Sequence, residues 1–141
     1  MLSDELKEEY FHLQKVIEDF DSKSITIKAW SVTLSMSGIG AAFLKEKSII
    51  LLLSGISALL FWIVEASWKH FQFSYYSRIR EIEKFVRGEL SQISPLQINT
   101  SWKQSYHERG LFRFLSIFFR AHVFLPHGII FIVGITLYLL L

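Results

Sequence analysis

The sequence predicts an all-α integral membrane protein with three transmembrane segments, and three observations lead to this fold class. Three apolar stretches, at about residues 25–44, 48–64 and 122–141, approach the roughly 20 residues that a helix needs to cross a bilayer. The mean hydropathy is +0.34, which is high for a soluble chain of 141 residues. The two prolines and seven glycines are spread along the chain, so long helices can form between them.

The composition argues against several classes of function. With 15 basic and 13 acidic residues the chain has no bulk positive charge for nucleic acid, so no nucleic-acid partner is expected. Cysteine is absent, which excludes disulfides and thiolate chemistry. The five histidines are scattered, and no nucleotide-binding, hydrolase or metalloprotease motif occurs. We therefore expect a protein that is not an enzyme, with no catalytic residue, no cofactor and no metal site.

Residues 1–24 are predicted to form a cytoplasmic amphipathic helix. Ser3 is a suitable N-cap, with acidic residues in the first turn. Apolar residues recur every three or four positions and form one stripe: Leu2, Leu6, Tyr10, Leu13, Ile17 and Phe20. The other face is acidic: Glu8, Glu9, Glu18 and Asp19. Because such a face repels anionic lipid, the stripe is expected to pack on protein rather than on the membrane surface.

Residues 25–64 are predicted to form a transmembrane hairpin, closed by a three-residue turn at 45–47. One face of the first span is small or polar throughout: Ser24, Lys28, Ser31, Ser35, Gly38 and Ala42. Close helix packing is the favoured interpretation, since small residues let backbones approach and hydroxyls bond across helices. A pore-lining face in an oligomer is the alternative. Ser54, Gly55 and Ala58 offer a matching small surface on the second span.

Residues 65–93 are predicted to continue the second span as a cytoplasmic helical extension. Its apolar residues keep a spacing of three and four, so the extension needs a partner. The N-terminal helix is the nearest candidate, and neighbouring copies are the second. Glu65 and Lys69 lie where the apolar segment ends, and an interfacial ion pair between them is the favoured interpretation. The alternative for Glu65 is a charged ring at the mouth of a pore.

Residues 94–121 are predicted to form a connector and an interfacial amphipathic helix, and residues 122–141 a third transmembrane helix. Pro95 breaks the preceding helix. Arg109, Arg113 and Arg120 alternate with aromatic residues, a composition suited to the headgroups of an anionic leaflet. The Pro-His-Gly step at residues 126–128 leaves a re-entrant segment as the alternative to a full third span.

The distribution of Lys and Arg predicts the orientation. Most of them outside the N-terminal helix fall in the middle segment, from about residue 65 to 122, and only two lysines lie in the hairpin turn. By the positive-inside rule the middle segment is cytoplasmic. The N-terminus then lies in the cytoplasm and the C-terminus outside, in what we expect to be a bacterial inner membrane.

Two passages resemble a known group of proteins: SKSITIKAWSVTLSMSG at 22–38 and FWIVEASWKHFQFSYYSRIREIE at 61–83. They are similar to small bacterial multi-span membrane proteins whose layout is that of the SLATT-type two-span domains. The resemblance covers about residues 10 to 90. It implies a membrane-disrupting effector in a bacterial conflict or antiviral defence system.

The sequence thus predicts a small homo-oligomer in the lipid bilayer. The expected function is that of a pore-forming or membrane-perturbing effector. The alternative is a non-catalytic scaffold that anchors a cytoplasmic protein partner. A chain with so few spans has little internal surface against which to bury its stripes, which is why we expect several copies to assemble.

Overall fold

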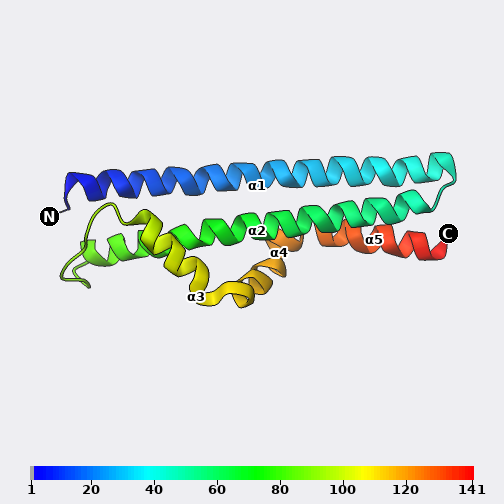
Figure 1. Ribbon diagram of the computed structural model, residues 1–141. Coiled ribbons are helices and arrows are strands. Elements are labelled where there is room, and N and C mark those ends of the chain that lie inside the picture. The colour runs from blue at the N-terminus through cyan, green and yellow to red at the C-terminus, as the bar shows by residue number, and fades with distance from the viewer. Residues whose placement is uncertain (1) are drawn as a thin grey trace.

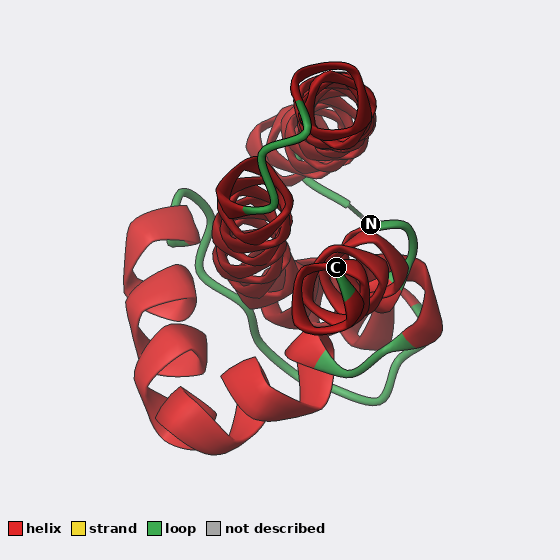
Figure 2. Cartoon of the chain, turned by 90° about the vertical axis from the view of Figure 1, so that its right-hand side faces the viewer, coloured by secondary structure: helices red, strands yellow, loops and turns green. Residues whose placement is uncertain are grey.

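The computed structural model describes residues 2–141, which fold into helices joined by short connections. The helices are α1 (Asp4–Lys45), α2 (Ile49–Val86), α3 (Ile98–Phe118), α4 (Ala121–Phe124) and α5 (His127–Leu140). Helices α1 and α2 lie side by side and antiparallel, and together they make a long rod (Figure 1). Helix α5 lies against α2 at the end of the rod that holds the α1–α2 turn, and α3 lies along the other part of α2. Seen along the rod, α1, α2 and α5 form a three-helix cluster at this end (Figure 2).

Helix α1 is one uninterrupted helix of 42 residues, about 63 Å long at 1.5 Å per residue. Its start is confirmed, because the Ser3 hydroxyl accepts a hydrogen bond from the Leu6 amide at 3.3 Å. The helix predicted at 1–24 and the span predicted from residue 25 are not separate helices, because both belong to α1. The stretch DSKS at 21–24 contains neither proline nor glycine, and its backbone continues the helix.

Helix α2 runs without a break from the second apolar stretch into the extension, as predicted, but it ends at Val86 rather than near residue 93. Gly88 has a φ of +79°, a left-handed conformation that glycine adopts readily and that stops the helix. The turn between α1 and α2 occupies residues 46–48, in agreement with the predicted tight hairpin.

In the half of the rod that contains the N-terminus, α1 and α2 bury a hydrophobic cluster. Its members are Leu6, Leu13 and Ile17 of α1 with Ile79 and Ile82 of α2. The stripe of the N-terminal residues therefore packs on protein, and the extension of α2 finds its partner in the same chain. Both expectations are confirmed.

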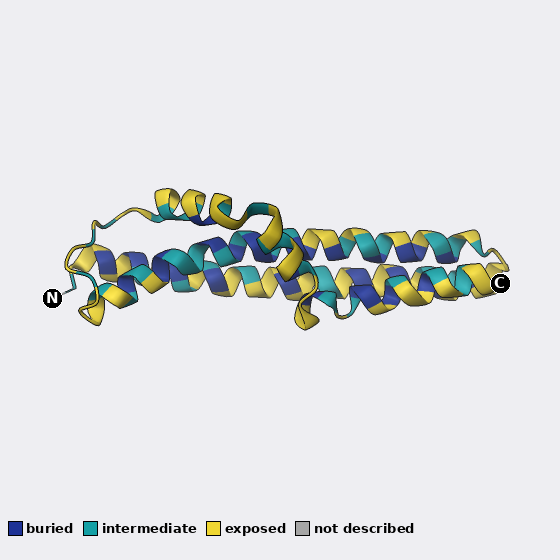
Figure 3. Ribbon diagram, turned by 90° about the horizontal axis from the view of Figure 1, so that it is seen from below, coloured by how far each residue is buried: buried dark blue, intermediate teal, exposed yellow. Residues whose placement is uncertain are grey.

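The other half of the rod, which we call the apolar half, comprises residues 25–64 and α5. Its core contains Ile39, Leu51 and Ala58, with Ile130 from α5. The helices approach closely at glycines: a Cβ on Gly134 would meet the Gly55 backbone at 3.0 Å. The outer surface of this half is rich in exposed large hydrophobic side chains, among them Trp30, Leu34, Phe43, Leu53, Leu60, Ile132 and Leu139. Figure 3 shows buried and exposed positions alternating along the helices of the rod.

Residues 122–141 do not form the third span-length helix that was predicted. Pro126 separates the four-residue helix α4 from α5, which has 14 residues and is about 21 Å long. Two helices, α1 and α2, are long and apolar enough to cross a membrane, and α5 is shorter. Helix α3 begins at Ile98, well before the predicted amphipathic segment, and it kinks at Gly110.

A buried polar cluster where three helices meet

The most unusual feature of the structure is a group of polar side chains buried at the junction of α1, α2 and α5. It consists of Ser24, Lys28 and Ser31 of α1, Glu65 of α2 and His127 of α5, and we call it the Glu65 cluster. The α1 residues are spaced by four and three, so they lie on one face of the helix. His127 is the first residue of α5, and the break at Pro126 places it beside them.

The carboxylate of Glu65 is fully buried and uses both of its oxygens. Oε1 accepts a hydrogen bond from the Ser24 hydroxyl at 2.6 Å and is paired with the Lys28 ammonium. Oε2 lies 2.7 Å from Nε2 of His127, whose Nδ1 lies 2.7 Å from the Ser31 hydroxyl. With neutral His127, Nε2–H donates to Glu65 and Nδ1 accepts from Ser31. Every polar atom of the carboxylate is therefore satisfied, as burial of a charge requires.

The cation of this cluster is less buried than the anion. The Lys28 side chain is 28% exposed, whereas the Glu65 side chain is 0% exposed. Lys28 also donates to the backbone carbonyl of His122 at 2.6 Å, which ties α1 to α4. The long lysine stem can thus bring its charge to the edge of the cluster, while Glu65 has no route to solvent.

The structure places the small and polar stripe of α1 in the contact with α2. Ser31 and Ser35 are fully buried, Ala42 is buried, and a Cβ on Gly38 would meet the Ser54 hydroxyl oxygen at about 2.1 Å. In a single chain the stripe therefore serves close helix packing, the favoured of its two interpretations. Within residues 2–141 the Ser35 hydroxyl finds no hydrogen-bond partner.

Glu65 and Lys69 do not form the ion pair that was predicted from their spacing. Lys69 donates instead to Asp21 at 2.6 Å and to Gln72 at 2.9 Å. Although partial burial would raise it, the pKa of Asp21 is lowered by hydrogen bonds from Lys69 and Gln72. Both charges of the predicted pair thus bond across the helix interface, because each is held on the face of α2 that contacts α1.

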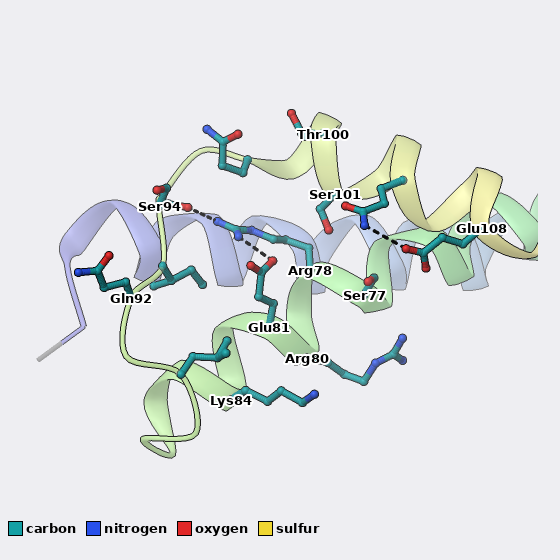
Figure 4. Close-up of a pocket in the computed structure, with 14 residues that line it drawn as sticks. Ser77, Arg78, Arg80, Glu81, Lys84, Gln92, Ser94, Thr100, Ser101 and Glu108 are labelled. Atoms are coloured by element: carbon teal, nitrogen blue, oxygen red, sulfur yellow. Dashed lines mark hydrogen bonds and ion pairs between the residues drawn. The ribbon is translucent and has the colours of Figure 1, made fainter.

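A third polar contact joins α1 and α2 toward the end of the rod opposite the α1–α2 turn. Arg78, which is buried, donates from Nε and Nη2 to the Glu9 carboxylate at 2.6 and 3.2 Å. It also donates to Glu81 at 2.9 Å and to the Ser94 carbonyl at 2.6 Å. Figure 4 shows Arg78 reaching Glu81 and Ser94 at the edge of a pocket of about 700 Å³. Glu9 is therefore buried in an ion pair, although the sequence placed it on the acidic face opposite the apolar stripe.

The three arginines predicted to contact lipid headgroups lie together on α3 and directly after it. Arg109, Arg113 and Arg120 line one cavity of about 360 Å³, and Arg80 of α2 lines it as well. Arg113 is held by hydrogen bonds to the Ser105 carbonyl at 2.8 Å and hydroxyl at 3.1 Å. Arg80 was not included in this group from the sequence, because nothing there relates α2 to α3.

His70 lies nearby on α2, stacked on Tyr106 with ring centroids 4.7 Å apart. Burial, assisted by the positive charge of Arg113, lowers the pKa of His70 below its ordinary range. The described residues contain no group of three acidic or histidine side chains placed to hold a metal ion.

His127 and Asp21 are interacting residues that the sequence argument did not find, and it placed Ser24 on the α1 stripe without its contact to Glu65. For His127 one signal existed, since a histidine beside a proline break in an apolar segment is an ionisable group that needs a partner. Comparisons with protein-family models, curated proteins and solved structures find no match for this chain.

Proposed function

We propose that this chain is an integral membrane protein in which the apolar half of the rod lies within the bilayer. Residues 25–44 of α1 and 49–64 of α2 would cross it, and α5 would enter from the side opposite the α1–α2 turn, where His127 lies beside Glu65, and would run toward the turn (Figure 1). The large hydrophobic side chains exposed around this half support the proposal, because such a surface is costly in water. Following the charge distribution, the proposed membrane is the bacterial inner membrane, with the N-terminus in the cytoplasm and the C-terminus outside.

Within that membrane we propose that the protein is an oligomeric pore-forming or membrane-perturbing effector, the role that the resemblance to SLATT-type domains implies. The observation that carries this proposal is the fully buried Glu65, which lies at the boundary of the apolar half and is paired with Lys28 and His127 of that half. Ionisable side chains at membrane depth are costly, and they commonly mark pathways for ions or protons.

The contacts of the Glu65 cluster correspond, in this proposal, to a closed state. Helices α2 and α5 cover the polar face of α1. The contacts that hold them there include hydrogen bonds and ion pairs, which hydrogen bonds to water can replace. Movement of α1 away from α2 would present Ser24, Lys28, Ser31 and Ser35 to water. Three helices are too few to enclose an aqueous path, so the active form requires several copies.

The Ser35 hydroxyl offers a direct test. Ser35→Ala keeps the shape of the α1–α2 contact but removes a buried hydroxyl that has no partner. The closed state should gain stability and the polar face should lose a hydroxyl, so we expect slower leakage. Release of a trapped dye from liposomes containing the purified protein measures this. The matched control is Gly40→Ala on the exposed side of α1, where an added Cβ meets nothing within 4 Å.

Two results would overturn the proposal. One is the absence of leakage from liposomes that hold an oligomer verified by its mass in detergent. The other is equal leakage from wild type, Ser35→Ala and Gly40→Ala. A stoichiometric cytoplasmic partner without leakage would favour the alternative role as a scaffold. That alternative has less support, since the apolar stripe of the α2 extension is already covered by Leu6, Leu13 and Ile17.

A further inference from the structure

The cavity between α2 and the second half of α3 brings together four arginines from distant parts of the sequence. Arg80 comes from α2, Arg109 and Arg113 from α3, and Arg120 from the residue that leads into α4. We call this the arginine cavity. Its volume is about 360 Å³. Four like charges repel one another, so such a grouping in a small space calls for a counter-charge.

The described chain does not supply that counter-charge. Among residues 2–141, no carboxylate oxygen lies within 4.0 Å of any of these four guanidinium groups, and the arginines that form ion pairs are Arg78 and Arg87. The nearest acidic side chain on α3, Glu108, accepts a hydrogen bond from Gln104. Partial burial and the charges of Arg109 and Arg80 lower the pKa of Arg113, although Glu108 opposes the shift. The electrostatic environment of the cavity thus favours an anion.

Several groups around the cavity are held in fixed positions. Two hydrogen bonds to Ser105 hold Nη1 of Arg113, which leaves its other N–H groups free to bind. The Arg120 guanidinium lies over the ring of Phe73, 4.9 Å from its centroid. The remaining wall includes Tyr76 and Ser116, which add hydroxyl groups. Donors held in this way lose less conformational entropy when a ligand binds.

We propose that the arginine cavity is a binding site for a phosphate-bearing anion, either a phospholipid headgroup or a free phosphate compound. Guanidinium groups bind phosphate oxygens through paired, charge-assisted hydrogen bonds. Exposed apolar residues of α3 adjoin the cavity, including Phe112, which lines it, and Leu111 and Leu115, and they would lie against acyl chains if the source is a lipid. The site is separate from the Glu65 cluster, and it does not depend on whether the protein permeabilises membranes.

Two binding measurements on the full chain distinguish the sources of phosphate. In the first, inorganic pyrophosphate is titrated calorimetrically into the protein in a nonionic detergent. In the second, the protein is placed in nanodiscs of phosphatidylcholine with and without phosphatidylglycerol, and the lipids that it retains are identified by native mass spectrometry. Binding in the first measurement indicates a free phosphate, and selective retention of phosphatidylglycerol in the second indicates a lipid.

The variants are Arg109→Gln and Arg113→Gln, with Lys103→Gln as the control of equal charge change on an exposed part of α3 outside the cavity. Each arginine variant should weaken binding about tenfold, while the control should stay near wild type. Arg109 makes no hydrogen bond within the described residues, so its loss should leave the fold intact even if that of Arg113 does not. Failure of both ligands to bind, or an equal effect of Lys103→Gln, would overturn the proposal.

Discussion

The asymmetry of the Glu65 cluster leads to a prediction about which of its two charges matters more for folding. Glu65 is fully buried, whereas Lys28 is 28% exposed and has a second acceptor in the His122 carbonyl. Lys28→Met would leave the buried Glu65 carboxylate without its ammonium partner, a change that costs about 3–5 kcal/mol of unfolding free energy in comparable cases. Glu65→Gln keeps hydrogen-bonding atoms at the same place and leaves only a partly exposed ammonium, so about 1–2 kcal/mol is expected.

Equilibrium unfolding in mixed micelles, followed by circular dichroism, measures both free energies. Lys15→Met is the control, because Lys15 is an exposed residue of the same helix and its loss should change stability by less than about 0.5 kcal/mol. The double variant Lys28→Met with Glu65→Gln should recover part of the loss, since the uncompensated carboxylate is gone. A Lys28→Met variant as stable as Glu65→Gln would refute the reasoning that Glu65 depends on Lys28 as its counter-charge.

Three further outcomes are expected from other contacts along the rod. Arg78→Met should lower the free energy of chemical unfolding by about 3–5 kcal/mol, because it leaves the buried Glu9 carboxylate without a counter-charge. Adding Glu9→Leu should recover much of this loss, and purely additive effects of the two substitutions would contradict the prediction. Gly134→Ala should lower the free energy of unfolding by about 1–3 kcal/mol, and with it the melting temperature, because the added Cβ would lie 3.0 Å from the α2 backbone. Gly40→Ala should lower neither. Burial would raise the pKa of Asp21, but hydrogen bonds from an ammonium and an amide of α2 lower it below 3.8. Its contribution to stability is therefore present near neutral pH and lost as the pH falls through that lowered value, a slope that Asp21→Asn should remove in acid titrations monitored by circular dichroism.

The sequence was sufficient for features that depend on local chemistry. The capping by Ser3, the short turn at 46–48 and the apolar stripe of the N-terminal residues all follow from side chains within a few positions of one another. The pairing of that stripe with the α2 extension followed from the tight turn, because a hairpin brings these segments together. The length of α1 was missed because a polar stretch such as residues 21–24 is compatible with either a connection or a helix.

The candidate site could be predicted only in part, because its residues come from three helices. Lys28, Ser31 and Glu65 were singled out correctly as unusual groups in or beside apolar segments. Ser24 was placed on the same stripe, but its contact with Glu65 and that of His127 were not predicted, since these residues lie 41 and 62 positions from Glu65 in the sequence. Opposite charges at a spacing of four, such as Glu65 and Lys69, suggest an ion pair along one helix. Both side chains lie on the buried face of α2, however, and they bond to residues of α1 instead. The same holds for Arg80, which joins Arg109 and Arg113 only through the packing of α3 on α2.

The unbroken length of α1 and α2 has a mechanical consequence. Neither helix contains a hinge between the turn at 46–48 and its opposite end, and polar contacts lock the two together at Glu9, Asp21 and Glu65. While these contacts hold, the two helices move as one rigid body. A tilt of a few degrees at the turn would then displace the opposite end of the rod by several ångströms.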